Sequence, residues 1–178
     1  MSIAPGRHRL GPENATLTVE TKRLGAASKV GHDLVIEVTS WEAELDVDGD
    51  PAVTLTADGG SLRVREGTGG MTKLGDEEKA GIERTIDEEV LRRRSVEFRS
   101  SAFEVSSDGS GATVSGELDL MGASHPVSFE LRTGDGRLTG RATLRQSDWG
   151  IKPYSALFGT LKVADEVEIA IDASLPQS

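Results

Sequence analysis

The chain has 178 residues, enough for one domain with a sizeable buried core, and carries a formal net charge of −10 with an isoelectric point near 4.8. This acidic balance argues against nucleic acid as a partner, because phosphates are neutralised by Lys and Arg, and against a polybasic hold on anionic lipid. The absence of cysteine excludes disulfides, thiol catalysis and cysteine-ligated metals.

The N-terminal residues and the hydropathy of the chain bear on its cellular location. Residues 1–8 contain no apolar segment of the kind found in secretory signals, and no run in the chain approaches the length of a membrane span. We therefore expect a cytoplasmic protein of one domain, residues 1–178, without an integral membrane segment.

Apolar and polar residues alternate in many short segments, a pattern typical of half-buried strands. These segments are residues 17–20, 34–38 leading into 41–47, 53–57, 62–65, 96–99, 113–120, 127–131, 138–144 and 163–172. Turn-forming residues separate them, most clearly at 108–111 and 134–136. The pattern predicts an antiparallel meander of about nine strands, and closure into a barrel would remove its exposed edges.

Residues 76–93 interrupt the alternation and are predicted to form a helix. Ile82, Ile86 and Val90 are spaced four apart and share one face. Asp76 can cap the start, and the acids in the first turn and the arginines at the end suit the helix dipole. The apolar stripe is narrow, so we expect the helix to lie against the sheet rather than inside it.

Residues 146–159 contain one of the two Trp, the only Tyr and one of the four Phe, although aromatic residues make up only 4% of the chain. Gly150, Pro153 and Gly159 favour a turning path through this segment. Large rigid rings in a loop just before the last strand predict either a plug that closes a core or the mouth of a pocket.

Several motifs suggest catalysis or metal binding, and a simpler interpretation is favoured for each. The glycines of residues 67–70 precede the helix, but three acids open that helix, so a loop is favoured over a phosphate site. His32 and Asp33 are neighbours, whose side chains would point to opposite faces of a strand. The histidines have no short ligand spacing and no Gly-x-Ser-x-Gly occurs. We expect no catalytic residues, metal or cofactor.

The aromatic residues as a set favour a ligand pocket, although each one alone is more simply a core residue. A barrel of about eight strands can hold one small apolar ligand. Gly116, Gly140 and Ala142 fall where inward side chains would lie, and small residues there would leave space.

Six segments are together similar to those of a known family. They are residues 29–34, 41–43, 61–70, 96–100, 116–127 and 146–154, and the spacing of glycine and tryptophan in the final third is the most specific part. On these residues the chain resembles the YceI family of bacterial polyisoprenoid-binding, lipocalin-like proteins over nearly its whole length. It looks like the cytoplasmic actinobacterial branch of that family. The lack of an expected signal segment is a departure from members with known lipid, which are often exported, so the resemblance implies the fold more securely than the ligand.

The resemblance implies an all-β fold, an eight-stranded antiparallel lipocalin-like barrel with one α-helix packed outside. It implies an elongated cavity for an isoprenoid or other lipid-like ligand, hence a carrier or storage protein more than an enzyme, and it leaves a homodimer open. The ligand-binding residues we expect are Trp41, Phe98, Phe129, Ala142, Trp149, Tyr154, Phe158, Lys152 and His32. Of these, His32, Lys152 and Tyr154 would orient the polar group of the ligand at the mouth of the cavity.

Two alternatives use the same fold. An enzyme would act on an apolar substrate in the cavity, with Asp148, Tyr154 and His32 as acid–base residues. An interaction or stress-response module would instead have a filled core, with no cavity large enough for a chain.

Overall fold

The computed structural model describes residues 6–70, 73–156, 159 and 161–175, and its architecture is all-β with one helical segment. One antiparallel sheet holds eleven strands in the order β1 (Arg7–Leu10), β5 (Trp41–Asp46), β6 (Ala52–Asp58), β8 (Ser95–Val105), β9 (Gly111–Leu120), β10 (Ala123–Gly134), β11 (Arg137–Arg145), β14 (Glu166–Ser174), β2 (Ala15–Thr21), β4 (Asp33–Val38) and β7 (Leu62–Thr68). A small second sheet has the order β12 (Ser155–Ala156), β13 (Leu161–Val163) and β3 (Arg23–Leu24).

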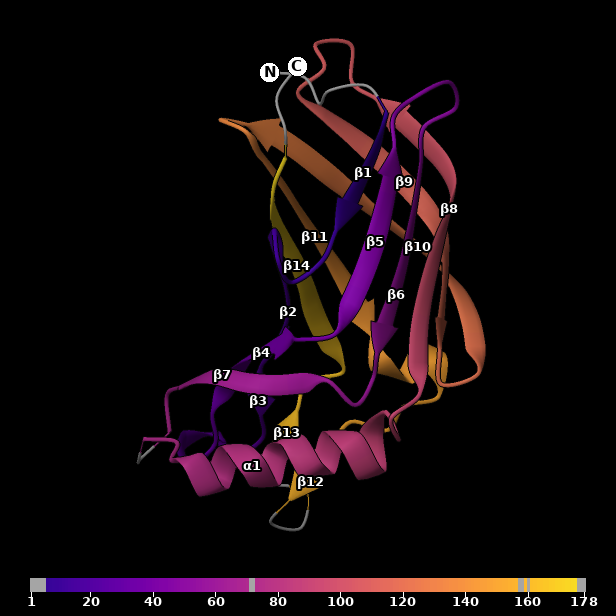
Figure 1. Ribbon diagram of the computed structural model, residues 1–178. Coiled ribbons are helices and arrows are strands. Elements are labelled where there is room, and N and C mark those ends of the chain that lie inside the picture. Colours follow the sequence, from indigo (N-terminus) through magenta and orange to yellow (C-terminus); the bar gives the residue numbers. More distant parts are fainter. Residues whose placement is uncertain (1–5, 71–72, 157–158, 160, 176–178) are drawn as a thin grey trace.

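The large sheet curls into an open half-barrel (Figure 1), so the expected closed barrel of eight strands is wrong in strand number and in closure. Strands β1 and β7 are its two edges. The reason is a bent ribbon. Residues 33–46 and 52–68 form one long hairpin that bends sharply between β4 and β5 and between β6 and β7. One half of the hairpin, β5 paired with β6, lies near one edge of the sheet, and the other half, β4 paired with β7, lies at the opposite edge. Each of the two arms of this hairpin therefore contributes two of the eleven strands.

Ser61 holds this corner together. The backbone N–H of Thr39 donates to the Ser61 carbonyl (3.0 Å), and the backbone N–H of Ser40 donates to Ser61 Oγ (3.1 Å). The Ser61 hydroxyl in turn donates to the Asp58 carbonyl (2.7 Å), and Ser61 is only 5% exposed. Because buried polar groups are costly unless they are paired, these bonds define where the ribbon bends.

The helical segment lies across one end of the half-barrel, the end at which β3, β12 and β13 are found (Figure 1). It consists of α1 (Asp76–Thr85) and a π-helical turn (Ile86–Val90). It is shorter than the expected 76–93 because Arg92 and Arg93 have positive φ angles, which turn the chain into β8.

The helix also protects an edge of the sheet. The backbone N–H of Val64 in β7 donates to Glu83 Oε2 on α1 (2.8 Å). A carboxylate side chain thus accepts the hydrogen bond that a further strand would otherwise accept, which protects the edge strand from pairing with another chain.

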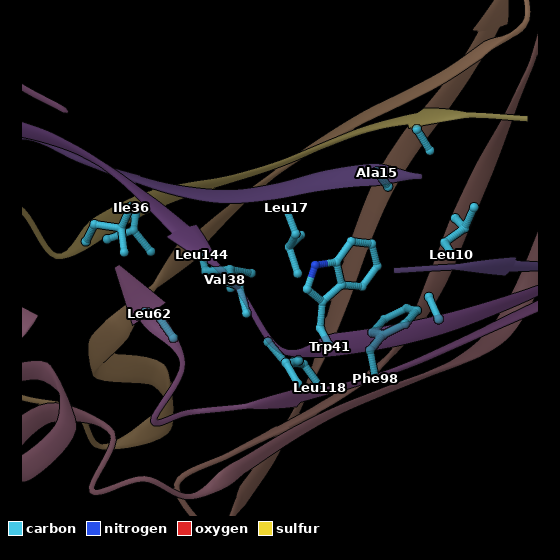
Figure 2. Close-up of a cluster of buried hydrophobic side chains, with 14 of the residues drawn as sticks. Leu10, Ala15, Leu17, Ile36, Val38, Trp41, Leu62, Phe98, Leu118 and Leu144 are labelled. Carbon is cyan, nitrogen blue, oxygen red and sulfur yellow. The ribbon is translucent and has the colours of Figure 1, made fainter. Parts of the chain in front are cut away.

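Alternate residues of the strands point to the inner face, as the period-two pattern predicts. The register places inner residues in rows, for example Ala142 beside Ile169, Ile169 beside Val19 and Val19 beside Ile36. The most deeply buried side chains include Leu45 and Val114. Figure 2 shows Trp41 and Phe98 among Leu10, Leu17 and Leu118 in the same hydrophobic cluster.

Gly116 is a sensitive point of this packing. A Cβ atom there would lie 2.2 Å from the Arg99 carbonyl oxygen and 2.7 Å from Phe98 Cζ. We predict that Gly116→Ala lowers the free energy of unfolding by about 3 kcal/mol, because backbone on a paired strand cannot retreat. Urea denaturation measures the change.

Gly134 provides the matched control, since a Cβ there would have no heavy atom within 4 Å. Gly134→Ala should change stability by less than about 0.5 kcal/mol. Equal losses in the two variants would show that the Phe98–Gly116 contact is not tight.

Candidate functional site

A cavity of about 800 Å³ occupies the half-barrel between the inner face of the large sheet and the helical segment. That volume is in the range of small-molecule binding sites. Its walls are overwhelmingly apolar and come from nearly every strand of the large sheet, including Leu17, Val19, Leu34, Ile36, Val38, Leu45, Val53, Leu55, Val96, Leu118, Leu120, Val127, Leu131, Leu138, Leu144, Val167, Ile169 and Ile171. The helical segment contributes Ile82, Ile86 and Val90, the stripe predicted from their spacing.

Many inner-face side chains are only half-buried, although they pack against the core. They include Val19, Leu34, Val53, Leu55, Val127, Phe129, Ile169 and Ile171. Apolar side chains of a filled core would bury nearly all of their surface against one another. Here their exposed surface faces the cavity, which argues against the alternative with a filled core.

Five of the expected binding residues line the cavity: His32, Phe98, Phe129, Ala142 and Tyr154. The rings of Phe98 and Phe129 lie with their centroids 5.4 Å apart and their planes tilted by 56°. The cavity wall therefore includes an aromatic pair contributed by two non-adjacent strands.

The other expected residues are placed differently. Trp41 and Trp149 are buried in the hydrophobic core and Lys152 is exposed, and none of the three is among the lining residues. Phe158 lies outside the described residues. Asp148, the acid–base candidate of the enzyme alternative, is exposed and does not line the cavity, whereas His32 and Tyr154 do.

Trp149 acts as a plug beside the cavity. Its indole Nε1–H donates to the Leu118 carbonyl (2.9 Å), and its ring meets that of His125 edge-on at 5.5 Å. Gly150, with φ +75°, reverses the chain directly afterwards. The segment then continues to Tyr154, which is 49% exposed and lines the cavity. The aromatic loop thus supplies both a plug and part of a mouth.

Trp41 differs from Trp149 in its hydrogen bonding. It is 6% exposed, and its indole Nε1 has no hydrogen-bond partner among the described residues. In Figure 2 this nitrogen lies on the side of Leu17 rather than on the side of Leu10. A buried N–H without a partner retains its full desolvation cost.

The small residues predicted to leave space have three different roles. Ala142 lines the cavity and is the clearest case. Gly140 also lines it, but a Cβ there would lie 2.7 Å from Leu131 Cδ2, so its space is largely taken. Gly116 is covered by the Phe98 ring and is not a lining residue.

The residues that line the cavity include four cations that were not predicted from the sequence: Arg23, Lys73, Arg141 and Lys162. Of these, Arg141 has its guanidinium paired with Glu168 on the outer face. Arg23 and Lys162 come together because β3 pairs with β13. No local pattern reports a pairing between strands so far apart in the chain. With His32, Tyr154 and the carboxylates Asp58 and Glu78 they form most of the polar part of a mainly apolar wall.

The glycines of residues 67–70 make room for two of these side chains. Gly69 and Gly70 both have positive φ angles, and their Cβ positions would fall within about 2.5 Å of the Arg23 guanidinium and the His32 imidazole, respectively. The glycine-rich loop therefore wraps the polar wall, in agreement with the loop interpretation.

Hydrogen bonds to carboxylates shift pKa values on the strands and the loop next to the site. A hydrogen bond from Arg141 lowers the pKa of Glu168 and raises that of Arg141. The hydroxyl and backbone N–H of Ser147 lower the pKa of Asp165. These bonds tie β11 to β14 and hold the start of the aromatic loop. Among the described residues, no three His, Asp or Glu side chains group as metal ligands.

Comparison with known proteins identifies the family. The model of the YceI-like domain matches residues 9–175. The chain belongs to the YceI-like family. A search of the curated proteins found no match. None of the helices in the described part of the chain is long and apolar enough to cross a membrane.

Solved structures agree with this family. BcnA of Burkholderia cenocepacia is 16% identical with a TM-score of 0.63, and the match covers 89% of this chain and 94% of that one. A mutant CJ YCEI protein with a monobromobimane guest is 12% identical with a TM-score of 0.58, covering 80% of this chain and 84% of that one. Identities this low establish a shared fold and nothing finer.

The two tryptophans allow a direct comparison of a paired and an unpaired indole. We predict that Trp149→Phe lowers the free energy of unfolding by about 1 kcal/mol more than Trp41→Phe. Both changes remove similar volume, but only the first breaks a hydrogen bond and leaves the Leu118 carbonyl short of a donor. Urea denaturation of both variants measures the two changes in the free energy of unfolding. A larger loss of stability for Trp41→Phe would contradict the assignment of Trp149 as the hydrogen-bonded indole and Trp41 as the unpaired one.

Proposed function

We propose that the protein carries or stores a single isoprenoid or similar lipid-like chain in its cavity. The observation that supports this most is an apolar cavity of about 800 Å³ whose wall side chains remain half-buried. A chain inserted there would cover apolar surface that the protein alone leaves uncovered.

The energetics suit such a ligand. Each buried methylene contributes about 0.8 kcal/mol, so a ten-carbon chain offers roughly 8 kcal/mol against an association cost of about 4 kcal/mol or more. The difference of about 4 kcal/mol corresponds to millimolar binding, and micromolar binding needs about 8 kcal/mol. About five further buried methylenes, as in a chain of three isoprene units, would supply the rest without any polar contact.

The polar groups have a separate role in this proposal. Arg23, His32, Lys73, Tyr154 and Lys162 line the cavity among apolar neighbours. A charged group buried in an apolar cavity is unfavourable without partners, so a polar head would lie beside these side chains and the tail would occupy the apolar interior. The ligand class is therefore an amphiphile.

A chain-length series tests the proposal. Geraniol, farnesol and geranylgeraniol should displace a fluorescent apolar probe with affinity that rises with each isoprene unit until the cavity is full. Ligand recovered unchanged by organic extraction supports a carrier, whereas a converted ligand would indicate the enzyme alternative. Affinity independent of chain length would overturn the proposal.

Filling the cavity should block binding. We predict that Ala142→Phe weakens farnesol binding at least tenfold, because its ring enters the cavity, and Phe129→Trp should act in the same direction. Tenfold corresponds to about 1.4 kcal/mol, less than two buried methylenes. Titration of the same probe measures both.

Thr143→Phe is the matched control, since Thr143 is the next residue of β11 and is exposed on the outer face. It should leave affinity unchanged. If all three variants bind as the wild type does, the ligand is not in this cavity.

A further inference from the structure

The lysines of this protein are distributed unevenly. The sequence contains six, at positions 22, 29, 73, 79, 152 and 162. Lys73 and Lys162 line the cavity, and Lys22, Lys29 and Lys152 are exposed on segments next to its polar wall. In a chain with a net charge of −10, this is a local concentration of positive charge.

These lysines differ from the arginines in their pairing. Most arginines on the outer face of the large sheet pair with carboxylates, as Arg137 does with Asp172 and Arg141 with Glu168. Lys29, Lys73, Lys152 and Lys162 form no ion pair within the part of the chain that the structure describes. Lys22 lies 3.8 Å from Asp33, and its charge also acts on Glu168. Their charge is therefore available to an external partner.

Exposed apolar side chains occur in the same place. The large hydrophobic residues that are most exposed in the described chain are Leu24 (51%), Val105 (55%) and Tyr154 (49%). Leu24 is the direct cross-strand partner of Lys162 in the β3–β13 pair. The Tyr154 carbonyl accepts a hydrogen bond from the backbone N–H of Val163 in the same small sheet (2.9 Å). Only Val105 lies elsewhere, at the end of β8.

We propose that this rim, defined as Lys22, Leu24, Lys29, Lys152, Tyr154 and Lys162, docks the cavity on the surface of a bilayer that contains anionic lipids. Lysines attract anionic headgroups, and Leu and Tyr side chains enter the interfacial layer. Docking would let the ligand pass between bilayer and cavity without crossing water. The inference thus rests on the proposed function for its purpose, but docking is measured separately.

The remaining charges define the orientation of the docked protein. The acids that open α1 include Glu78, which lines the cavity from the helix side. They lie at the same end of the half-barrel as β3 and β13 (Figure 1) and would be repelled by anionic lipid, so the docked protein would turn the β3–β13 side of that end toward the bilayer and α1 away from it. The acidic net charge argued against a polybasic hold on lipid, but only charges within about 8 Å of a surface act strongly on it in physiological salt.

Flotation with vesicles of phosphatidylcholine alone, or mixed with phosphatidylglycerol, tests the inference. The wild type should bind the mixed vesicles and not the neutral ones. Lys29→Glu/Lys152→Glu should weaken binding at least tenfold, since each lost lysine costs about fivefold, and Leu24→Ser about fivefold. None of these three residues lines the cavity, so displacement of the apolar probe should be unchanged.

Matched controls remove equal charge and apolar area elsewhere. Arg99→Glu/Arg132→Glu alters two exposed arginines of the large sheet, and Val105→Ser removes the remote apolar residue. Both should float as the wild type does. Equal losses in controls and rim variants, or no binding to mixed vesicles, would overturn docking and favour a protein partner. Docking without probe uptake would instead overturn the carrier proposal alone.

Discussion

The structure depends on one packing constraint: the apolar side chains of the inner face do not meet across the half-barrel. A strand-rich domain normally gains its stability by burying that face completely. Here residues such as Phe129 and Ile169 stay half-buried around a cavity of about 800 Å³. Because this apolar surface stays uncovered, its burial does not contribute to the free energy of unfolding of the protein alone. A ligand that covers it would stabilise the folded state by mass action.

The rest of the fold keeps that space open. The bent ribbon, fixed at Ser61, lets the sheet curl without closing on itself. The helical segment covers one end and protects β7 through the bond between Val64 and Glu83. Elsewhere the core is tight, because Phe98 rests on Gly116 and Trp149 is anchored to Leu118. Rigid surroundings of this kind keep a cavity from collapsing, since the walls cannot relax into it.

Much of this was predictable from the sequence. Period-two alternation located the strands and their inner faces, spacing by four located Ile82 and Ile86 on the helix, and motif resemblance indicated the family. Strand number and closure were not predictable, because the corner is made by hydrogen bonds between Ser61 and residues 39–40, about twenty positions away. The cations Arg23 and Lys162 were missed for the same reason, since only the β3–β13 pairing unites them. Composition likewise could not distinguish Trp149, which packs in the core, from Tyr154, which lines the cavity.

The central claim is that the cavity holds a lipid-like chain. Native mass spectrometry of the protein purified from its own host, followed by organic extraction, tests it most directly. The account predicts one apolar or amphiphilic molecule of discrete mass per chain, released intact by extraction. Protein that carries nothing extractable, and that also fails to take up a fluorescent apolar probe, would contradict it.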